Sequence, residues 1–215
     1  MIEQKVSGTV YGVVLNDHAS LRKIGSEVLA GAPYKGAPKA PAMYIKPANT
    51  RVACGSAVEL PAGASAVEVG ASVGLLMGRA AGRLSRAEAL DAVAGIVLAA
   101  DLSLPHASYY RPAIREKCFD ASLPIGSVKP LVDLAGLVIV TEIDGEVVDE
   151  RSLADLVRDP VQLLVDVTEF MTLAEGDLLL VGVAYMAPQA IAGSQVRISA
   201  AGLGSLQFSI TGARA

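Results

Sequence analysis

Residues 137–150 read LVIVTEIDGEVVDE. Two runs rich in β-branched residues flank the pair Asp144-Gly145, and an Asp-Gly pair supplies the two positive-φ residues that a type I′ turn requires. The stretch therefore predicts a β-hairpin. Outward from it, runs of Val, Ile, Leu and Tyr predict strands at residues 7–15, 42–46, 64–77, 178–184, 195–200 and 205–210.

Three segments between these strands predict helices, namely residues 20–30, 85–99 and 160–171. The first has apolar residues at helical spacing, although Gly25 weakens it. The second begins with Ser85 and Glu88 in the register of a capping box, ahead of a long apolar run. The third begins with Asp159 as a cap and Pro160 in the first turn. Many strands with two or three inserted helices make an α+β fold in which β structure dominates.

The composition sets limits on what the chain does. The 215 residues are 52% hydrophobic but only 4% aromatic, so an aliphatic core is expected, and the length fits one domain covering residues 1–215. A formal net charge of −4 argues against a partner that is a nucleic acid or an anionic membrane. The chain has only two cysteines, Cys54 and Cys118, which favours a reducing compartment. We expect no secretory signal, and the apolar runs are too short to cross a bilayer. A cytoplasmic location is therefore expected.

Four blocks of sequence resemble the fumarylacetoacetate hydrolase superfamily. They are VVLNDHASL at 13–21, MYIKPANT at 43–50, KCFDASLPIG at 117–126 and TEFMTLAEGDLLLVG at 168–182. Within that superfamily, SLPHASYYRPAIREKCFD at 103–120 and GASVGLLMGR at 70–79 are similar to the amino-terminal one of the two homologous halves of the isomerase/decarboxylases of 4-hydroxyphenylacetate catabolism. The resemblance implies a strand-rich mixed β roll and a dimer.

The superfamily implies a divalent metal that binds a 2-oxo or enol acid and is held by a Glu-x-Glu strand and a distant Asp. Alternate residues of a strand point the same way, and carboxylate oxygens suit Mg²⁺. Here Gly70 and Ser72 stand at the two Glu positions, and Asp101 stands at the Asp position. Glu68 lies about 6.6 Å further along the strand, too far for the same coordination sphere unless the strand bulges. We therefore expect a degenerate metal site and no metal in this chain.

Two residues match catalytic positions of the superfamily. Lys117 matches a lysine that faces the active site, where its ammonium would pair with a carboxylate or stabilise developing charge; the alternative is a solvated surface lysine. His18 stands at the place of a flap histidine that serves as general base, but its glutamate partner is replaced by Leu21. The alternative for His18 is a loop or cap residue.

Three further residues are expected to bind the substrate. The resemblance implies this role for Lys46 in the MYIKPANT block and for Tyr110 and Arg111 in the long connection at 103–124. Arg111 could hold a carboxylate in bidentate fashion, or it could stack on tyrosine and order the loop. The superfamily's Gly-Thr-Pro turn, which offers a hydroxyl to the substrate carboxylate, is Gly182-Val183-Ala184 here.

Three functions remain open from the sequence. In the first, the chain is one part of a two-part isomerase/decarboxylase, and a homologous partner chain carries Mg²⁺ or Mn²⁺. In the second, it acts alone on a 2-oxo acid as a decarboxylase, isomerase or hydrolase. In the third, it is a non-catalytic binding module that retains only the fold. The small-molecule partner in the first two is a dicarboxylate or tricarboxylate 2-oxo acid, and the chain is expected to form a homo-oligomer or a hetero-oligomer.

Overall fold

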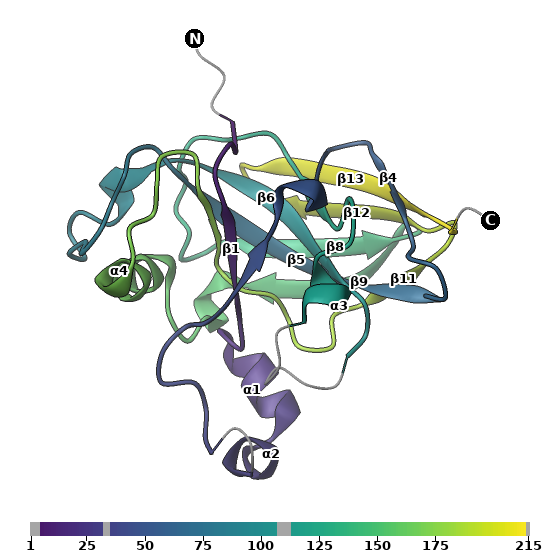
Figure 1. Cartoon of the computed structure of the whole chain (residues 1–215), viewed down its shortest axis with the longest axis horizontal. Coiled ribbons are helices and arrows are strands. Elements are labelled where there is room, and N and C mark those ends of the chain that lie inside the picture. The colour runs from purple at the N-terminus through teal and green to yellow at the C-terminus, as the bar shows by residue number, and fades with distance from the viewer. Residues whose placement is uncertain (1–4, 32–34, 107–112, 214–215) are drawn as a thin grey trace.

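The structure is a computed structural model that describes residues 5–31, 35–106 and 113–213 (Figure 1). Its strands are β1 (Val10–Val14), β2 (Ala42–Lys46), β3 (Arg51–Ala53), β4 (Ala57–Glu59), β5 (Ala66–Met77), β6 (Val93–Ser103), β7 (Leu123–Ile125), β8 (Val138–Ile143), β9 (Glu146–Ser152), β10 (Leu178–Leu180), β11 (Gln189–Ile191), β12 (Gln195–Ala200) and β13 (Gly204–Thr211). Its helices are α1 (His18–Ile24), α2 (Ser26–Ala30), α3 (Ile114–Lys117) and α4 (Pro160–Phe170), with single 3₁₀ turns at Ala48–Thr50, Leu90–Ala92 and Leu153–Asp155. In the described part, no helix is both long and apolar enough to cross a membrane.

The strands form two mixed sheets. The larger sheet has eight strands in the order β2-β1-β10-β5-β6-β7-β3, with β11 also paired to β5, and its β1–β10 and β3–β7 pairs are parallel. The smaller sheet has the order β4-β13-β12-β8-β9. The strand-rich α+β fold expected from the sequence is therefore confirmed.

The hairpin predicted at Asp144-Gly145 is confirmed. It joins β8 to β9, and the two turn residues have φ angles of 55° and 89°. Helix α4 also begins where it was expected, because the Asp159 carboxylate accepts a hydrogen bond from the Gln162 backbone N–H at 2.7 Å. Both features depend on local residue chemistry that the sequence displays directly.

The prediction of a helix at residues 85–99 is wrong. The Glu88 carboxylate does accept hydrogen bonds from the Ser85 backbone N–H at 3.1 Å and from the Ser85 hydroxyl at 2.6 Å, but the segment after them makes only turns and one 3₁₀ turn. The apolar run then continues as β6, which pairs with β5 from Glu68↔Ser103 to Met77↔Val93. Since β6 is buried on both faces, its sequence lacks the alternation that marks a strand, and an apolar run of that kind resembles a buried helix.

The segment predicted as one helix at 20–30 is two short helices. Gly25 separates α1 from α2 and has a φ of 86°, which a helix interior does not allow. The four-residue helix α3 was not predicted.

The two faces of the larger sheet are buried by different partners. One face packs on the smaller sheet and on α4, and forms the main core. The other face lies inside the roll, where a second apolar cluster consists of Val10, Leu76, Val97, Ala99, Leu123, Leu178 and Leu180. Figure 1 shows β2 crossing in front of β6, which closes the roll over this inner face.

Candidate functional site

The inner face of the roll changes from apolar to polar along β6. Ala99 belongs to the apolar cluster, and Asp101, two residues on, points the same way because strand side chains alternate. Across the pair with β5, Ser72 lies opposite Ala99 and Gly70 lies opposite Asp101. Sheet register thus brings the three positions expected at the degenerate metal site onto one face.

Asp101 is the centre of a buried charge cluster. The residue is 1% exposed, and its Oδ1 lies 2.8 Å from the Lys46 Nζ while its Oδ2 lies 2.6 Å from the Lys117 Nζ. The Tyr44 hydroxyl donates a further hydrogen bond to Oδ2 at 2.5 Å. Burial acts to raise the pKa of Asp101, but the two ammonium groups outweigh it and lower the pKa to about 2. The carboxylate is therefore ionised throughout the physiological range.

The ammonium of Lys46 is committed to the protein. It donates to the Leu102 carbonyl at 3.0 Å, to the Lys117 carbonyl at 2.5 Å and to the Ser122 hydroxyl at 3.1 Å, and the residue is 1% exposed. Burial lowers the pKa of Lys46, opposed by Asp101. Lys46 thereby ties β2 to β6 and to the residues that follow α3. Direct contact with a substrate stays a prediction for this residue, since its donors already have partners.

Lys117 has a different environment. It ends α3 and is 5% exposed, so its ammonium is buried rather than solvated as in a surface lysine. Within the described ranges, its ammonium hydrogen-bonds to Asp101 and lies 4.5 Å from the centre of the Tyr44 ring, an arrangement of the cation–π type. An ammonium has three N–H donors, so two of them have no partner in the described part of the chain and can meet a ligand.

The residues at the degenerate metal site do not fit a divalent cation. Both oxygens of Asp101 face ammonium groups, and Gly70 supplies no ligand. A Cβ atom at Gly70 would lie 2.7 Å from the Asp101 carbonyl oxygen and 2.9 Å from Val183 Cγ1, so a longer side chain has no free path there. The Ser72 hydroxyl donates to the Gly182 carbonyl at 2.8 Å. Among the residues described, no group of three or more His, Cys, Asp or Glu side chains is placed to hold a metal.

Two residues of this region were missed by sequence reasoning. Arg151 on β9 is buried, and its Nη2 donates to the carbonyls of Ala71 at 3.1 Å and Gly182 at 2.8 Å. Arg151 lies beside the part of β5 that has no strand neighbour on this side, between the residues paired with β10 and those paired with β11. Tyr44 could have been found from its spacing, because it lies two residues before Lys46 and so shares a strand face with it.

Glu68 lies two residues before Gly70 on β5, on the same face of the strand. It is paired with Ser103 across the sheet, and burial raises its pKa, opposed by His106 and Lys117. His106 lies beside it, with its Nδ1 3.0 Å from the Leu104 carbonyl. This end of the inner face therefore carries a half-buried carboxyl group with an imidazole close to it.

The structure does not bring His18 to the charge cluster. His18 is exposed at the start of α1, directly after the cap residue Asp17, as the loop or cap alternative describes. Its catalytic role stays a prediction. Helix α1 itself is held to the loop at 181–188, because the Ser20 hydroxyl accepts from the Tyr185 N–H at 2.8 Å and Lys23 donates to the Tyr185 carbonyl. Tyr110 and Arg111 lie outside the described residues.

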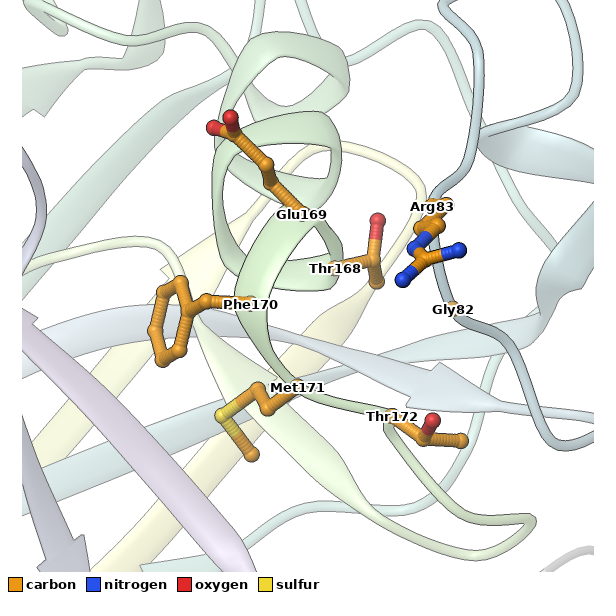
Figure 2. Close-up of a pocket in the computed structure, with 7 residues that line it drawn as sticks. All are labelled: Gly82, Arg83, Thr168, Glu169, Phe170, Met171 and Thr172. Atoms are coloured by element: carbon orange, nitrogen blue, oxygen red, sulfur yellow. The ribbon is translucent and has the colours of Figure 1, made fainter.

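A separate cavity of about 480 Å³ lies where α4 ends, lined by Gly82, Arg83 and residues 168–172 (Figure 2). Arg83 and Thr168 face each other across it, while the Phe170 ring points away from Arg83. The cavity shares no residue with the Asp101 cluster, and the carboxylate of Glu169, the other charged residue that lines it, points away from Arg83. It is not the candidate site.

Comparison with known proteins agrees with this architecture. A family model described as fumarylacetoacetate (FAA) hydrolase C-terminal matches residues 9–211. The chain is 39% identical over 202 residues to the 4-hydroxyphenylacetate degradation bifunctional isomerase/decarboxylase of Escherichia coli, and 40% identical over 202 residues to the protein of that name from Salmonella dublin. Each match covers 94% of this chain and 47% of the relative, so the chain spans about half the length of these relatives.

Solved structures share the fold at lower identity. A 5-carboxymethyl-2-hydroxymuconate delta-isomerase from Mycobacterium smegmatis superposes with a TM-score of 0.82 at 22% identity, covering 98% of this chain and 79% of that one. A fumarylpyruvate hydrolase from Pseudomonas aeruginosa, in complex with Mn²⁺ and pyruvate, superposes with a TM-score of 0.80 at 21% identity, covering 95% and 89%. By its family match and by its identity to these relatives, the chain belongs to the fumarylacetoacetate hydrolase family.

Proposed function

We propose that this chain is one subunit of an isomerase/decarboxylase of 4-hydroxyphenylacetate catabolism. Its substrates would be acids of the 5-carboxymethyl-2-oxo-hexene-dioate type and the 2-hydroxy-hepta-2,4-diene-1,7-dioate type. Its partner would be a homologous chain that keeps an intact Glu-x-Glu strand and holds Mg²⁺ or Mn²⁺. The identity of 39–40% to the bifunctional relatives, over half of their length, supports this assignment.

The observation that carries the need for a partner is the state of Asp101. Its two carboxylate oxygens lie against Lys46 and Lys117, so the residue is neutralised by ammonium groups rather than available to a cation. Metal-assisted chemistry would then belong to the partner. The contribution of this chain is to bind an anionic acid beside the ammonium of Lys117.

The chemistry open to this chain is electrostatic. Isomerisation and decarboxylation of a 2-oxo acid both place negative charge on the 2-oxygen as an enolate forms. A buried ammonium that has two N–H donors without a partner among the described residues stabilises such an oxygen more strongly than water does, because the surrounding dielectric is low. Lys117 is the residue that meets this requirement.

The test compares the purified chain, a homologue with the intact Glu-x-Glu strand, and their mixture. Each is incubated with Mg²⁺ and an acid of the 5-carboxymethyl-2-oxo-hexene-dioate type, which has three carboxylates. Decarboxylation by the mixture that exceeds the sum of the separate activities is the expected result. Lys117→Met in this chain should lower the mixture's activity about a hundredfold or more, whereas Lys39→Met, at an exposed position, should not. Millimolar Mg²⁺ or Mn²⁺ should raise the melting temperature of the partner and leave that of this chain unchanged.

A second candidate, an enzyme that acts alone on a 2-oxo acid, is favoured by the intact Asp101–Lys117–Tyr44 cluster. Activity of the isolated chain equal to that of the mixture would establish it. A non-catalytic binding module would instead bind the acid without turnover in any combination, and Lys117→Met would change affinity alone.

A further inference from the structure

Tyr44 and Gly12 form a cross-strand pair on the inner face of the roll. They are register partners on β2 and β1. A Cβ atom at residue 12 would lie 2.6 Å from Cε2 of the Tyr44 ring, and closer still to its Cζ atom and hydroxyl. The ring therefore lies flat over Gly12, in space that any other residue would fill. An aromatic residue over a cross-strand glycine fixes the direction of the ring.

This direction aims the ring at the charge cluster. The hydroxyl reaches Asp101 Oδ2, the same oxygen that accepts from Lys117, and the Lys117 Nζ lies over the ring face. Tyr44 thus touches both members of the ion pair, one through its hydroxyl and the other through its π-system. Lys46 does not need such support, because backbone carbonyls and the Ser122 hydroxyl hold it.

Lys117 has less to hold it. Helix α3 is four residues long, and its N-cap position, Ala113, makes no side-chain capping bond. Among the residues that the structure describes, Asp101 and the Tyr44 ring beneath it are the groups that set the orientation of the ammonium.

We propose that Tyr44, held in place by Gly12, is the positioning residue that aims the Lys117 ammonium into the site. The hydroxyl restrains the carboxylate that Lys117 bonds to, and the ring limits the ammonium to one side of it. This inference rests on the proposed function only in taking Lys117 as the group that meets the substrate. Its geometric part can be tested without any substrate.

The first variant is Tyr44→Phe, which keeps the ring and removes the hydroxyl. It should lower kcat about tenfold, the equivalent of one hydrogen bond to a charged group, and should change KM by less than about twofold. Tyr11→Phe is the matched control, because Tyr11 lies on the opposite face of β1 and packs on the main core. The control should leave both constants unchanged.

A second readout needs no activity. Reductive methylation with formaldehyde and borohydride, followed by peptide mass spectrometry, measures how accessible each lysine is. Tyr44→Phe should raise the labelling of Lys117 several-fold, and Tyr44→Leu, which removes the π face as well, should raise it further. Lys46 should stay unlabelled in each variant and so reports that the fold is intact.

A third variant moves the ring without changing it. Gly12→Ala should push Tyr44 away from Asp101 and raise the labelling of Lys117, although the hydroxyl is still present. Combined with Tyr44→Leu, the same alanine should have little further effect, because the clash is with the aromatic ring. Non-additivity of this kind is the expected signature of direct contact.

Unchanged labelling of Lys117 in both Tyr44→Phe and Gly12→Ala would overturn the inference. Changed labelling with no activity in wild type, alone or with the partner, would support the positioning role and reject the proposed function. Changed labelling with kcat unaffected would reject the catalytic consequence of that positioning. Loss of activity with Lys46 newly labelled would mean that Tyr44 serves the fold and not Lys117.

Discussion

At the scale of single residues, the buried cluster combines one carboxylate with two lysines. Neutral replacement of Asp101 would leave two buried ammonium groups facing an amide. Breaking a buried ion pair by removing one partner costs about 3–5 kcal/mol, because the charge left behind is not compensated. We predict that Asp101→Asn lowers the free energy of unfolding by about that amount in urea titrations.

Asp91→Asn, at an exposed position just before β6, is the control and should change the free energy of unfolding by less than about 0.5 kcal/mol. A cost for Asp101→Asn similar to that of the control would mean that the lysines are neutral in the folded protein.

The same residue predicts how stability depends on pH. The folded-state pKa of Asp101, about 2, lies below its ordinary value of 3.8, so the folded protein binds fewer protons than the unfolded chain between these values. The resulting stabilisation, about 2 kcal/mol, is fully present above pH 4 and is lost as the pH falls from about 4 towards 2. Urea titrations across this range should show the loss in wild type, and the difference from Asp101→Asn should shrink by the same amount.

At the scale of elements, the hairpin turn offers a matched pair of glycines. Gly145 has a φ of 89°, whereas Gly136 has no positive φ, and at both positions a Cβ atom would have no neighbour within 4 Å. Gly145→Ala should therefore destabilise the protein by about 1 kcal/mol through backbone strain alone. Gly136→Ala should be neutral or slightly stabilising, and thermal melts of the two variants side by side test this. Equal melting temperatures would show that the turn relaxes without cost.

Local chemistry explains which elements could be predicted from the sequence. The Asp144-Gly145 turn and the Asp159 cap depend on residues next to each other in the chain, and both are confirmed. The helix prediction at 85–99 was wrong although Ser85 and Glu88 do interact, because the apolar run that follows them pairs with β5 as a strand. Capping residues favour a helix locally, and a distant strand partner overrides them.

The residues of the candidate site likewise fall into those that could be predicted from the sequence and those that could not. Resemblance supplied Asp101 and Lys117, and the structure joins them at 2.6 Å. The role of Lys46 as an anchor and the presence of Tyr44 depend on how the roll closes β2 over β6, which no local pattern encodes. Arg151 was missed for the same reason, since its partners lie 31 and 80 residues away in the chain.

At the scale of the whole molecule, one core connects the two sheets. Residues of β5 and β6, of the smaller sheet and of α4 belong to the same buried cluster. We predict a single cooperative unfolding transition, as expected for one domain covering residues 1–215. Far-ultraviolet circular dichroism and tyrosine fluorescence should give coincident urea midpoints. Two separated midpoints would mean that the sheets unfold independently.

Strand β5 has two partners on one side and a break between them. β10 pairs with Gly74 to Leu76, and β11 pairs with Ala66 to Glu68. Between these two stretches, the Ala71 carbonyl accepts a hydrogen bond from the Arg151 side chain instead of from a neighbouring strand. In hydrogen–deuterium exchange, the Ala71 amide should therefore lose its proton faster than those of Gly70 and Ser72, which face β6. The centre of the longest strand would then be its most labile point, and slower exchange at Ala71 on adding an acid would report occupancy of the site without any assay of turnover.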